Sequence, residues 1–272
     1  MLCRDYLILL LLAVVSANSI AADSISNKQQ DNKASISIII DDVGYRQRED
    51  MRAANLPGAI SYAILPHAPY GPRMAKLLHS LDRDVIVHIP MEAERSNHLL
   101  GPGALTAAMP TAEFRTSLHD SIVSVPHAIA VSNHMGSLLT RDPEAMHQLM
   151  QLLQPLGLSY IDSKTSAQSV AAKAASDWGI PFLQRDVFLD HDRDPEAIRY
   201  QYTQLLAKAR RDGSAIAIGH PYPETLAILA ELLPGLAGEN IRLVGIRSLL
   251  QQQKAAIAGG KRNRLHLSAS GN

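Results

Sequence analysis

The sequence is almost free of cysteine. Its one cysteine, Cys3, lies in an apolar N-terminal segment, and no small-residue lipidation motif leads to it. If that segment is removed, the mature chain contains no cysteine and can form no disulfide. A chain of 272 residues can bury enough apolar surface to fold without one. The absence therefore suits an oxidising compartment as long as no disulfide is needed.

Charge of one sign and aromatic side chains are also scarce. The 26 acidic and 26 basic residues cancel to a formal net charge of zero, so the chain carries no electrostatic footprint for nucleic acid. Aromatic residues make up 4%, which argues against wide stacking platforms for bases or sugars. With 46% hydrophobic and 19% charged residues, the composition is globular, and the length allows one large domain of α/β-barrel size.

The N-terminus departs from this average composition. An apolar run from Tyr6 to Ala17 follows Arg4 and is too short to be interpreted first as a membrane span. Ser19 and Ala21 then form the S-x-A pattern of a signal peptidase site. We predict that residues 1–22 are a cleaved signal peptide and that the protein is exported, most simply to a periplasm, without stable membrane insertion. Cleavage after Ala17 and an uncleaved anchor are the alternatives.

The rest of the chain divides into three parts. Residues 23–34 are polar and lack periodicity, which predicts a linker. Residues 35–250 are predicted to form a single domain. Residues 251–272 carry a small basic cluster and a Gly-Gly pair, and we predict a disordered tail, with a functional basic arm as the alternative.

Strand-like and helix-like segments alternate through the domain. Eight runs rich in Ile and Val lack strict alternation, as expected of parallel strands buried on both faces. They span residues 35–41, 60–66, 84–90, 128–133, 158–162, 181–188, 215–220 and 241–246. Helices are predicted at Pro72–Leu81, Thr111–Ser124 with Thr111 as the cap, Asp142–Leu153, Ala167–Trp178, Asp194–Arg211 and Pro223–Leu233. Seven or eight such repeats favour a closed or nearly closed β/α barrel, with a doubly wound open sheet as the alternative.

Polar side chains end one predicted strand after another. In β/α barrels, functional groups collect at the carboxyl ends of the strands. The residues at these ends are Asp41, Asp42, His67, His88, Glu92, Asn133, His134, Asp162, Asp186 and His220. This clustering indicates a site at one mouth of the barrel.

Asp41 and Asp42 directly follow a run containing four isoleucines. Neighbouring side chains on a strand point to opposite faces, so we expect the two carboxylates to have different roles. Held so close together they repel each other, and they need a metal ion or a protonated histidine as partner. One carboxylate would then bind a cation while the other takes a proton from water. The alternative is an ordinary helix cap.

Two further segments offer ligands for a metal. His88 ends a buried strand and Glu92 follows four residues later, where Pro90 prevents a regular helix but a turn can still bring both to one cation. In "SNHMGSLLT", His134 is a good ligand for a borderline divalent metal such as zinc. Asn133 and Ser137 supply polar groups beside it. Each segment could instead be a buried histidine or a capped turn without a metal.

His220 lies in "AIAIGHPYPET", where two prolines fix the turn around it. A rigidly held histidine suits a general acid acting near neutral pH. Asp162 or Asp186 could orient a catalytic histidine, and Arg185 could pair with a carboxylate of the protein or of the substrate.

Five motifs resemble those of the divergent polysaccharide deacetylase family, a branch of the NodB-like carbohydrate esterases. They are "IIIDDVGY", "VIVHIPME", "SNHMGS", "RDVFLD" and "IGHPYPET", in this order between Ser35 and Leu250. The resemblance implies a single-domain, distorted (β/α)7–8 barrel with a divalent metal, usually zinc, at the strand ends.

The resemblance also implies roles for single residues. Asp41 matches the general base, Asp42 the first metal ligand and His220 the general acid. The superfamily's H-x-x-x-H motif becomes His88-x-x-x-Glu92 here, so we predict Asp42, His88 and His134 as the ligands and Glu92 as a reserve. The superfamily's Arg-Pro-rich motif is missing, and "NHMGS" occupies its place.

The predicted function is a metal-dependent hydrolase of amide carbon–nitrogen bonds that removes N-acetyl groups from a cell-envelope polysaccharide. A non-catalytic, metal-binding envelope protein that binds glycan or protein partners is the first alternative, and hydrolysis of another ester or amide is the second. Further candidates for contacting the metal or the substrate are Glu92, Asn133, Ser137, Asp162, Arg185 and Asp186.

Overall fold

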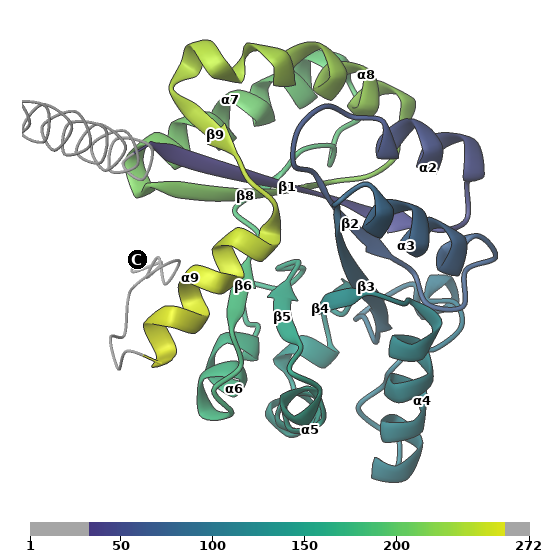
Figure 1. Ribbon diagram of the computed structural model, residues 1–272. Coiled ribbons are helices and arrows are strands. Elements are labelled where there is room, and N and C mark those ends of the chain that lie inside the picture. The colour runs from purple at the N-terminus through teal and green to yellow at the C-terminus, as the bar shows by residue number, and fades with distance from the viewer. Residues whose placement is uncertain (1–32, 259–272) are drawn as a thin grey trace, which may run out of the picture.

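The computed structural model describes residues 33–258, and Figure 1 shows their arrangement. Nine parallel strands form one sheet in the order β6-β5-β4-β3-β2-β1-β8-β7, with β9 also paired to β1. The strands are β1 (Ala34–Val43), β2 (Ser61–Ile64), β3 (Asp84–Met91), β4 (Ala128–Met135), β5 (Ser159–Asp162), β6 (Phe182–Gln184), β7 (Val187–Phe188), β8 (Ser214–Gly219) and β9 (Ile241–Leu243).

All but the last of the helices lie on the outer side of this sheet, and the last one packs against the inner apolar cluster (Figure 1). They are α2 (Gln47–Ala54), α3 (Gly71–Ser80), α4 (Thr111–Ser124), α5 (Pro143–Leu153), α6 (Ala171–Asp177), α7 (Pro195–Asp212), α8 (Pro223–Leu232) and α9 (Ile246–Ala258). The curled sheet with helices around it is a distorted β/α barrel, as predicted from the sequence.

The stretch predicted as one strand over residues 181–188 is two short strands. The amide of Arg185 still donates to Asp162 on β5, at 3.0 Å, whereas the amide of Asp186 donates to Ile216 on β8, at 2.8 Å. The chain therefore pairs with β5 first and switches to β8 within two residues. Because β6 and β7 are the two ends of the strand order, this switch connects the two edges of the curled sheet.

The isoleucine-rich β1 serves two cores at once. Ile39 belongs to an apolar cluster inside the barrel, together with Ile86 on β3 and Ile216 on β8. Ile38 and Ile40 belong to the larger cluster between the sheet and the outer helices. Both faces of the strand are therefore buried, which explains why its sequence lacks an apolar–polar alternation.

Helix starts follow simple capping rules, with one correction. Asp142 accepts hydrogen bonds from the amides of residues 144 and 145, both at 2.9 Å, and Asp194 caps α7 in the same way. Thr111 was predicted as a cap but is the first residue of α4, and the cap position is Pro110 without a side-chain hydrogen bond. Proline fixes the extended backbone that a helix start needs, so no hydroxyl cap is used here.

The C-terminal boundary of the domain lies beyond the predicted residue 250. Strand β9 ends at Leu243, and α9 begins at Ile246 and continues through Ala258. The side chain of Gln253 accepts the amide of Phe182 on β6 at 2.7 Å, so the start of the predicted tail belongs to the fold. Residues 259–272 lie outside the described residues.

The N-terminal predictions are largely outside the described part of the chain. This holds for the signal peptide, residues 1–22, and for most of the linker, residues 23–34. The last linker residue, Ala34, already pairs with Ile241 of β9. Between residues 33 and 258, no helix has the length and apolar character needed to cross a membrane.

Candidate metal centre and catalytic site

Both carboxylates at the end of β1 face the mouth of the barrel. Asp41 has the same strand parity as the inward-facing Ile39, so its direction follows from regular alternation. Asp42 would point outward in a regular strand. Its backbone is left-handed, with φ 58°, and the register of β1 with β2 shifts at this point. Contrary to the expected split, the two carboxylates contact the same nitrogen of His88, each at 3.4 Å.

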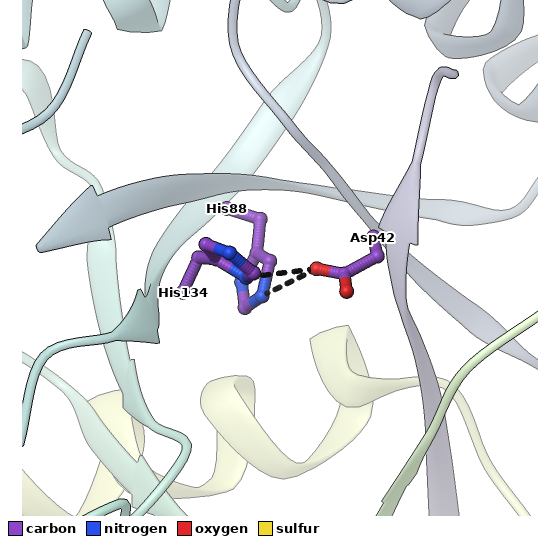
Figure 2. A group of neighbouring side chains, drawn as sticks. All are labelled: Asp42, His88 and His134. Atoms are coloured by element: carbon purple, nitrogen blue, oxygen red, sulfur yellow. Dashed lines mark ion pairs between the residues drawn. The ribbon is translucent and has the colours of Figure 1, made fainter. Parts of the chain in front are cut away.

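Asp42, His88 and His134 form a group that can hold a metal ion. Each offers one ligand atom, and these atoms all lie within 4.8 Å of one another. Figure 2 shows the two imidazoles facing the carboxylate of Asp42, with His134 Nδ1 at 2.9 Å from its Oδ1. The three residues come from β1, β3 and β4, which are close neighbours in the sheet. This is the ligand set predicted from the sequence.

A serine on the neighbouring strand orients His88. The Nδ1 atom of His88 lies 2.8 Å from the hydroxyl of Ser132, which leaves Nε2 directed at the two aspartates. The parallel register pairs His88 with Ser132 and Pro90 with His134, so the orienting group lies two residues before the other histidine ligand. Sequence analysis did not identify Ser132, although the pairing of β3 with β4 would have indicated it. Such outer contacts fix the ligand's tautomer and direction.

His220, directly after β8, is held by Asp190. Its Nδ1 lies 2.9 Å from Asp190 Oδ1, while Oδ2 accepts the amide of His220 at 2.6 Å and the hydroxyl of Thr225 at 2.8 Å. The other imidazole nitrogen, Nε2, lies 3.7 Å from Asp42 Oδ2. The orienting carboxylate is therefore Asp190, and the prediction that Asp162 or Asp186 would take this role for His220 is wrong.

Burial and mutual contact shift the acidity of these groups in different directions. Burial raises the pKa of Asp41, against the opposing charges of His88 and His220. Burial also acts to raise the pKa of Asp42, but the close contacts with His134 and His88 hold it well below its usual range. For His220, burial lowers the pKa, and Asp190 together with Asp42 overcomes this and raises it to about 9. The low pKa keeps Asp42 negatively charged at neutral pH, and the pKa of about 9 keeps the His220 imidazole protonated there.

Glu92 and Ser137 do not join the ligand group. The carboxylate of Glu92 accepts the amide of Ala107 at 2.9 Å, and its backbone carbonyl accepts two amides of the loop after β4. The hydroxyl of Ser137 accepts the amide of Glu94 at 3.0 Å. Both side chains connect the loops that follow β3 and β4, and the structure gives them no contact with the three ligands.

Asn133 and Asp162 stabilise the strand ends behind the site. The side-chain carbonyl of Asn133 accepts the amide of Ser163 at 2.9 Å. Asp162 accepts the hydroxyl of Ser169 and the amide of Lys164, both at 2.7 Å, and burial raises its pKa despite these bonds. The hydrogen bonds of both side chains are therefore made to other residues of the protein and stabilise its fold.

Arg185 and Asp186 point in opposite directions from the switch between β6 and β7. Arg185 donates to the backbone carbonyls of Ser163 and Lys164, at 2.6 and 2.9 Å, and its guanidinium lies 5.0 Å from the ring centre of Phe188. Burial lowers its pKa, while the charge of Asp41 acts against this shift. Asp186 instead accepts the amide of Ile216 and lies 3.4 Å from Lys208 of α7.

A cleft of about 500 Å³ opens beside the ligand group. Its walls are largely apolar and come from the loops after β1, β2 and β3. The lining residues are Asp42, Tyr45, Arg46, Leu65, Pro66, Pro90, Leu99, Leu100, Gly101, Pro102, His134 and Met135. A bound molecule can therefore reach Asp42 and His134 from solvent.

The donor set fits a divalent cation. One carboxylate and two imidazoles suit a borderline ion such as zinc. The Oδ1 atom of Asp41 is buried and has no hydrogen-bond partner within the described residues, while Oδ1 of Asp42 contacts only the two imidazoles of the ligand group. Asp41 is buried and Asp42 half-buried, and both contact one imidazole nitrogen. Two carboxylates held so close repel each other, and a cation between the ligands would compensate this charge.

Similar proteins are known from several bacteria. YibQ of Escherichia coli is 36% identical over 217 residues, which cover 80% of this chain and 67% of YibQ. An uncharacterized protein of Haemophilus influenzae is 38% identical over 222 residues, covering 82% of this chain and 79% of that protein.

Two solved structures show the same fold. An uncharacterized protein from Agrobacterium tumefaciens superimposes with a TM-score of 0.77 at 23% identity, covering 80% of this chain and 89% of that one. The mutant peptidoglycan deacetylase PdaC from Bacillus subtilis gives a TM-score of 0.50 at 12% identity, covering 85% and 97%. The family model for divergent polysaccharide deacetylases matches residues 38–250. With this match and the sequence relatives, the chain belongs to the divergent polysaccharide deacetylase family.

Proposed function

We propose that the protein is an exported, divalent-metal-dependent hydrolase that removes N-acetyl groups from a cell-envelope polysaccharide. Membership of the deacetylase family supports the reaction class. The apolar run at Tyr6–Ala17 and the S-x-A pattern after it support export. The carboxylate and two imidazoles of the ligand group support a zinc-type ion.

Asp42, His88 and His134 would hold the ion. A divalent cation at this position supplies a Lewis acid, which polarises a carbonyl and lowers the pKa of water. Ser132 keeps His88 in the required orientation, and the left-handed backbone of Asp42 turns its carboxylate toward the histidines.

Asp41 is the general base of the proposed reaction. It is buried, its pKa is raised, and its Oδ1 has no regular hydrogen-bond partner in the described structure. Asp41 accepts a proton from the attacking water as the water oxygen forms a bond to the amide carbon.

His220 is the general acid. Asp190 fixes its Nδ1, and its Nε2 is directed toward Asp42, on the side of the ligand group. With a pKa of about 9 it carries a proton at neutral pH. Transfer of this proton to the amide nitrogen accompanies cleavage of the carbon–nitrogen bond and leaves acetate and a free amine.

One observation carries the proposal. A buried carboxylate, a carboxylate-held imidazole and a three-residue ligand group meet at one mouth of the barrel, although the chain positions range from Asp41 to His220. A protein that only binds a metal has no need for a proton acceptor and a protonated imidazole on either side of its ligands.

The test combines metal analysis with an activity assay. The full-length protein, loaded with zinc, is incubated with N-acetylglucosamine oligomers, and released acetate is measured. Asp41→Asn and His220→Ala should each lower the rate by roughly 10²–10⁴. His119→Ala, at an exposed histidine of α4, is the matched control and should keep the wild-type rate. Equal rates for all four proteins would reject the catalytic assignment, whereas one bound zinc without acetate release would favour the binding alternative.

A further inference from the structure

Arg46 is fixed beside the ligand group by a buried carboxylate. The turn after β1 directs the amides of Gly44 and Arg46 at Asp50 Oδ2, at 2.9 and 3.2 Å. Asp50 is fully buried in α2, so this carboxylate ties the turn to the helix. The same turn follows Asp41 and Asp42 directly. The position of Arg46 relative to the catalytic carboxylates is therefore set by the fold.

The guanidinium of Arg46 lies 5.4 Å from the centre of the Tyr222 ring, a cation–π distance. Arg193 lies over the same ring at 4.4 Å. The two arginines differ in their partners. Arg193 binds both oxygens of Glu224, at 3.1 and 2.9 Å, whereas Arg46 has no carboxylate at ion-pair distance among residues 33–258.

Arg46 also lines the cleft that leads to Asp42 and His134. It is the one Lys or Arg among the lining residues, and most of the others are apolar. A guanidinium presents a planar set of donors that matches a carboxylate or a phosphate in two-point contact. Arg46 is itself exposed, so any shielding of such a contact comes from the apolar walls of the cleft beside it.

We propose that this cleft binds an anionic substituent of the glycan, a carboxylate or a phosphate, and that Arg46 is the residue that selects it. This inference rests on the proposed deacetylase function and specifies its substrate class. The N-acetyl group lies at Asp42 and His134, and the anionic substituent is on the same or the adjacent sugar, within the cleft. The Tyr222 ring, 5.4 Å from the guanidinium, is the side-chain contact that favours this position of Arg46.

The experiment measures the activity of the zinc-loaded, full-length protein on three kinds of oligosaccharide of equal length, one of them in two forms. One is a neutral N-acetylglucosamine tetramer. The second has a lactyl carboxylate on alternate sugars, with its amidated form as the neutral match, and the third carries phosphate monoesters. Acetate release gives kcat/KM for each. The wild type should prefer an anionic oligomer over its neutral match by roughly ten- to hundredfold, the range expected for a charge-assisted contact.

Arg46→Ala should reduce this preference to within about threefold of unity, and Arg46→Lys should retain a part of it because the charge stays. Arg48→Ala is the matched control, since Arg48 is an exposed arginine two residues further along and does not line the cleft. Its preference ratio should equal that of the wild type. Whether the carboxylate or the phosphate arm shows the larger ratio identifies the anion.

Binding without turnover separates the two proposals. Calorimetry with the fully deacetylated forms of the same oligomers should show tighter binding of the anionic form, dependent on Arg46. Acetate release with equal kcat/KM for anionic and neutral oligomers, or a preference that survives Arg46→Ala, overturns the anion site and leaves the deacetylase proposal intact. Arg46-dependent binding without acetate release from any oligomer supports the anion site and overturns the deacetylase proposal.

Discussion

The two ends of the barrel differ in how their carboxylates are paired. At the amino ends of the strands, α9 closes the barrel with Ile246, Leu249 and Leu250 in the inner apolar cluster. Asp84 accepts both the amide and the side-chain Nε of Arg247 there, each at 2.9 Å. At the carboxyl ends, Asp41 keeps a buried oxygen without a hydrogen-bond partner among the described residues, and Asp42 contacts the imidazoles of His88 and His134. One end is built for stability and the other holds charge ready for a ligand.

Backbone strain shows the same difference. Left-handed residues occur at the amino ends too, but Asp82, His127 and Asn240 lie in turns before a strand, where such side chains are tolerated. At the carboxyl ends, Asp42 and Met135 are left-handed within the strands themselves, with φ of 58° and 57°. Asp42 belongs to the candidate ligand group, and Met135 directly follows its member His134. Strain of this kind persists where the surrounding structure enforces it, commonly at functional sites.

Removal of a ligand should give the largest effect and test this comparison directly. In His88→Ala, the zinc affinity should fall by more than about a hundredfold, because even outer contacts of a ligand contribute ten- to hundredfold. Glu92→Gln should change the affinity no more than a few fold, since the carboxylate of Glu92 is bonded to the amide of Ala107. Competition with a chelating dye measures both dissociation constants.

His79→Ala is the control for loss of a histidine, because His79 is exposed on α3 and stacks on His127, away from the ligand group. Its zinc affinity should equal that of the wild type. An equal loss of zinc affinity in His88→Ala and Glu92→Gln would indicate that Glu92 is a ligand. Glu92 would then replace His134 in the proposed ligand set.

The architecture was predictable because burial on both faces leaves a clear sequence pattern. Long Ile- and Val-rich runs such as that at Ile38–Ile40 predicted the strands, and polar residues at their ends predicted the mouth. The split of residues 181–188 was not predictable, because hydrophobicity does not report which neighbour a strand pairs with. The start of α9 was missed as well, since its apolar residues were interpreted as the end of a strand.

The ligand group was predictable, but the residues that orient it were not. Asp42, His88 and His134 each stand out by their chemistry at a strand end. Ser132 and Asp190 act through contacts with other strands, and these depend on register and on the path of the loop after β7. Asp42 points inward because its backbone is left-handed, a conformation that aspartate and asparagine tolerate. No local sequence motif predicted this conformation.

The closed end should show a smaller, purely structural effect. Leu249 is 4% exposed, and Leu249→Ala should lower the free energy of unfolding by about 2–4 kcal/mol through lost burial and the remaining cavity. Urea denaturation of the metal-free protein measures the change. Ile257→Ala on the same helix, at a half-exposed side chain, should stay within about 0.5 kcal/mol.

Zinc affinity completes this test. If the two ends are independent, Leu249→Ala keeps the wild-type dissociation constant, since the substituted residue lies far along the barrel from the ligands. A weaker zinc affinity in this variant would show that the packing of α9 also positions the ligand group. The two ends of the barrel would then not be independent.

The smallest expected effect concerns Asp190 and is distinguished by its dependence on pH. The folded-state pKa of His220, about 9, lies above the value of 6.5 that histidine has in an unfolded chain. Protonation of His220 therefore stabilises the folded protein fully below pH 6.5, and this contribution is lost as the pH rises through 9. In Asp190→Asn, the hydrogen bond between two charged groups is weakened. The variant should lose about 1–3 kcal/mol at pH 6 and progressively less as the pH approaches 10.

Urea denaturation of the metal-free protein at pH 6, 8 and 10 measures this convergence. In a His220→Ala background, Asp190→Asn should show little dependence on pH, because the titrating partner is gone. Leu249→Ala should lower the free energy of unfolding by the same amount at all three pH values, since leucine carries no titrating group. Parallel pH curves for the wild type and Asp190→Asn would contradict the coupling of His220 to Asp190. We expect the change in the free energy of unfolding to be independent of pH for Leu249→Ala and dependent on pH for Asp190→Asn. This result would show that proton binding is coupled to folding at the carboxyl ends of the strands and not at the amino ends. A site that transfers protons requires such coupling.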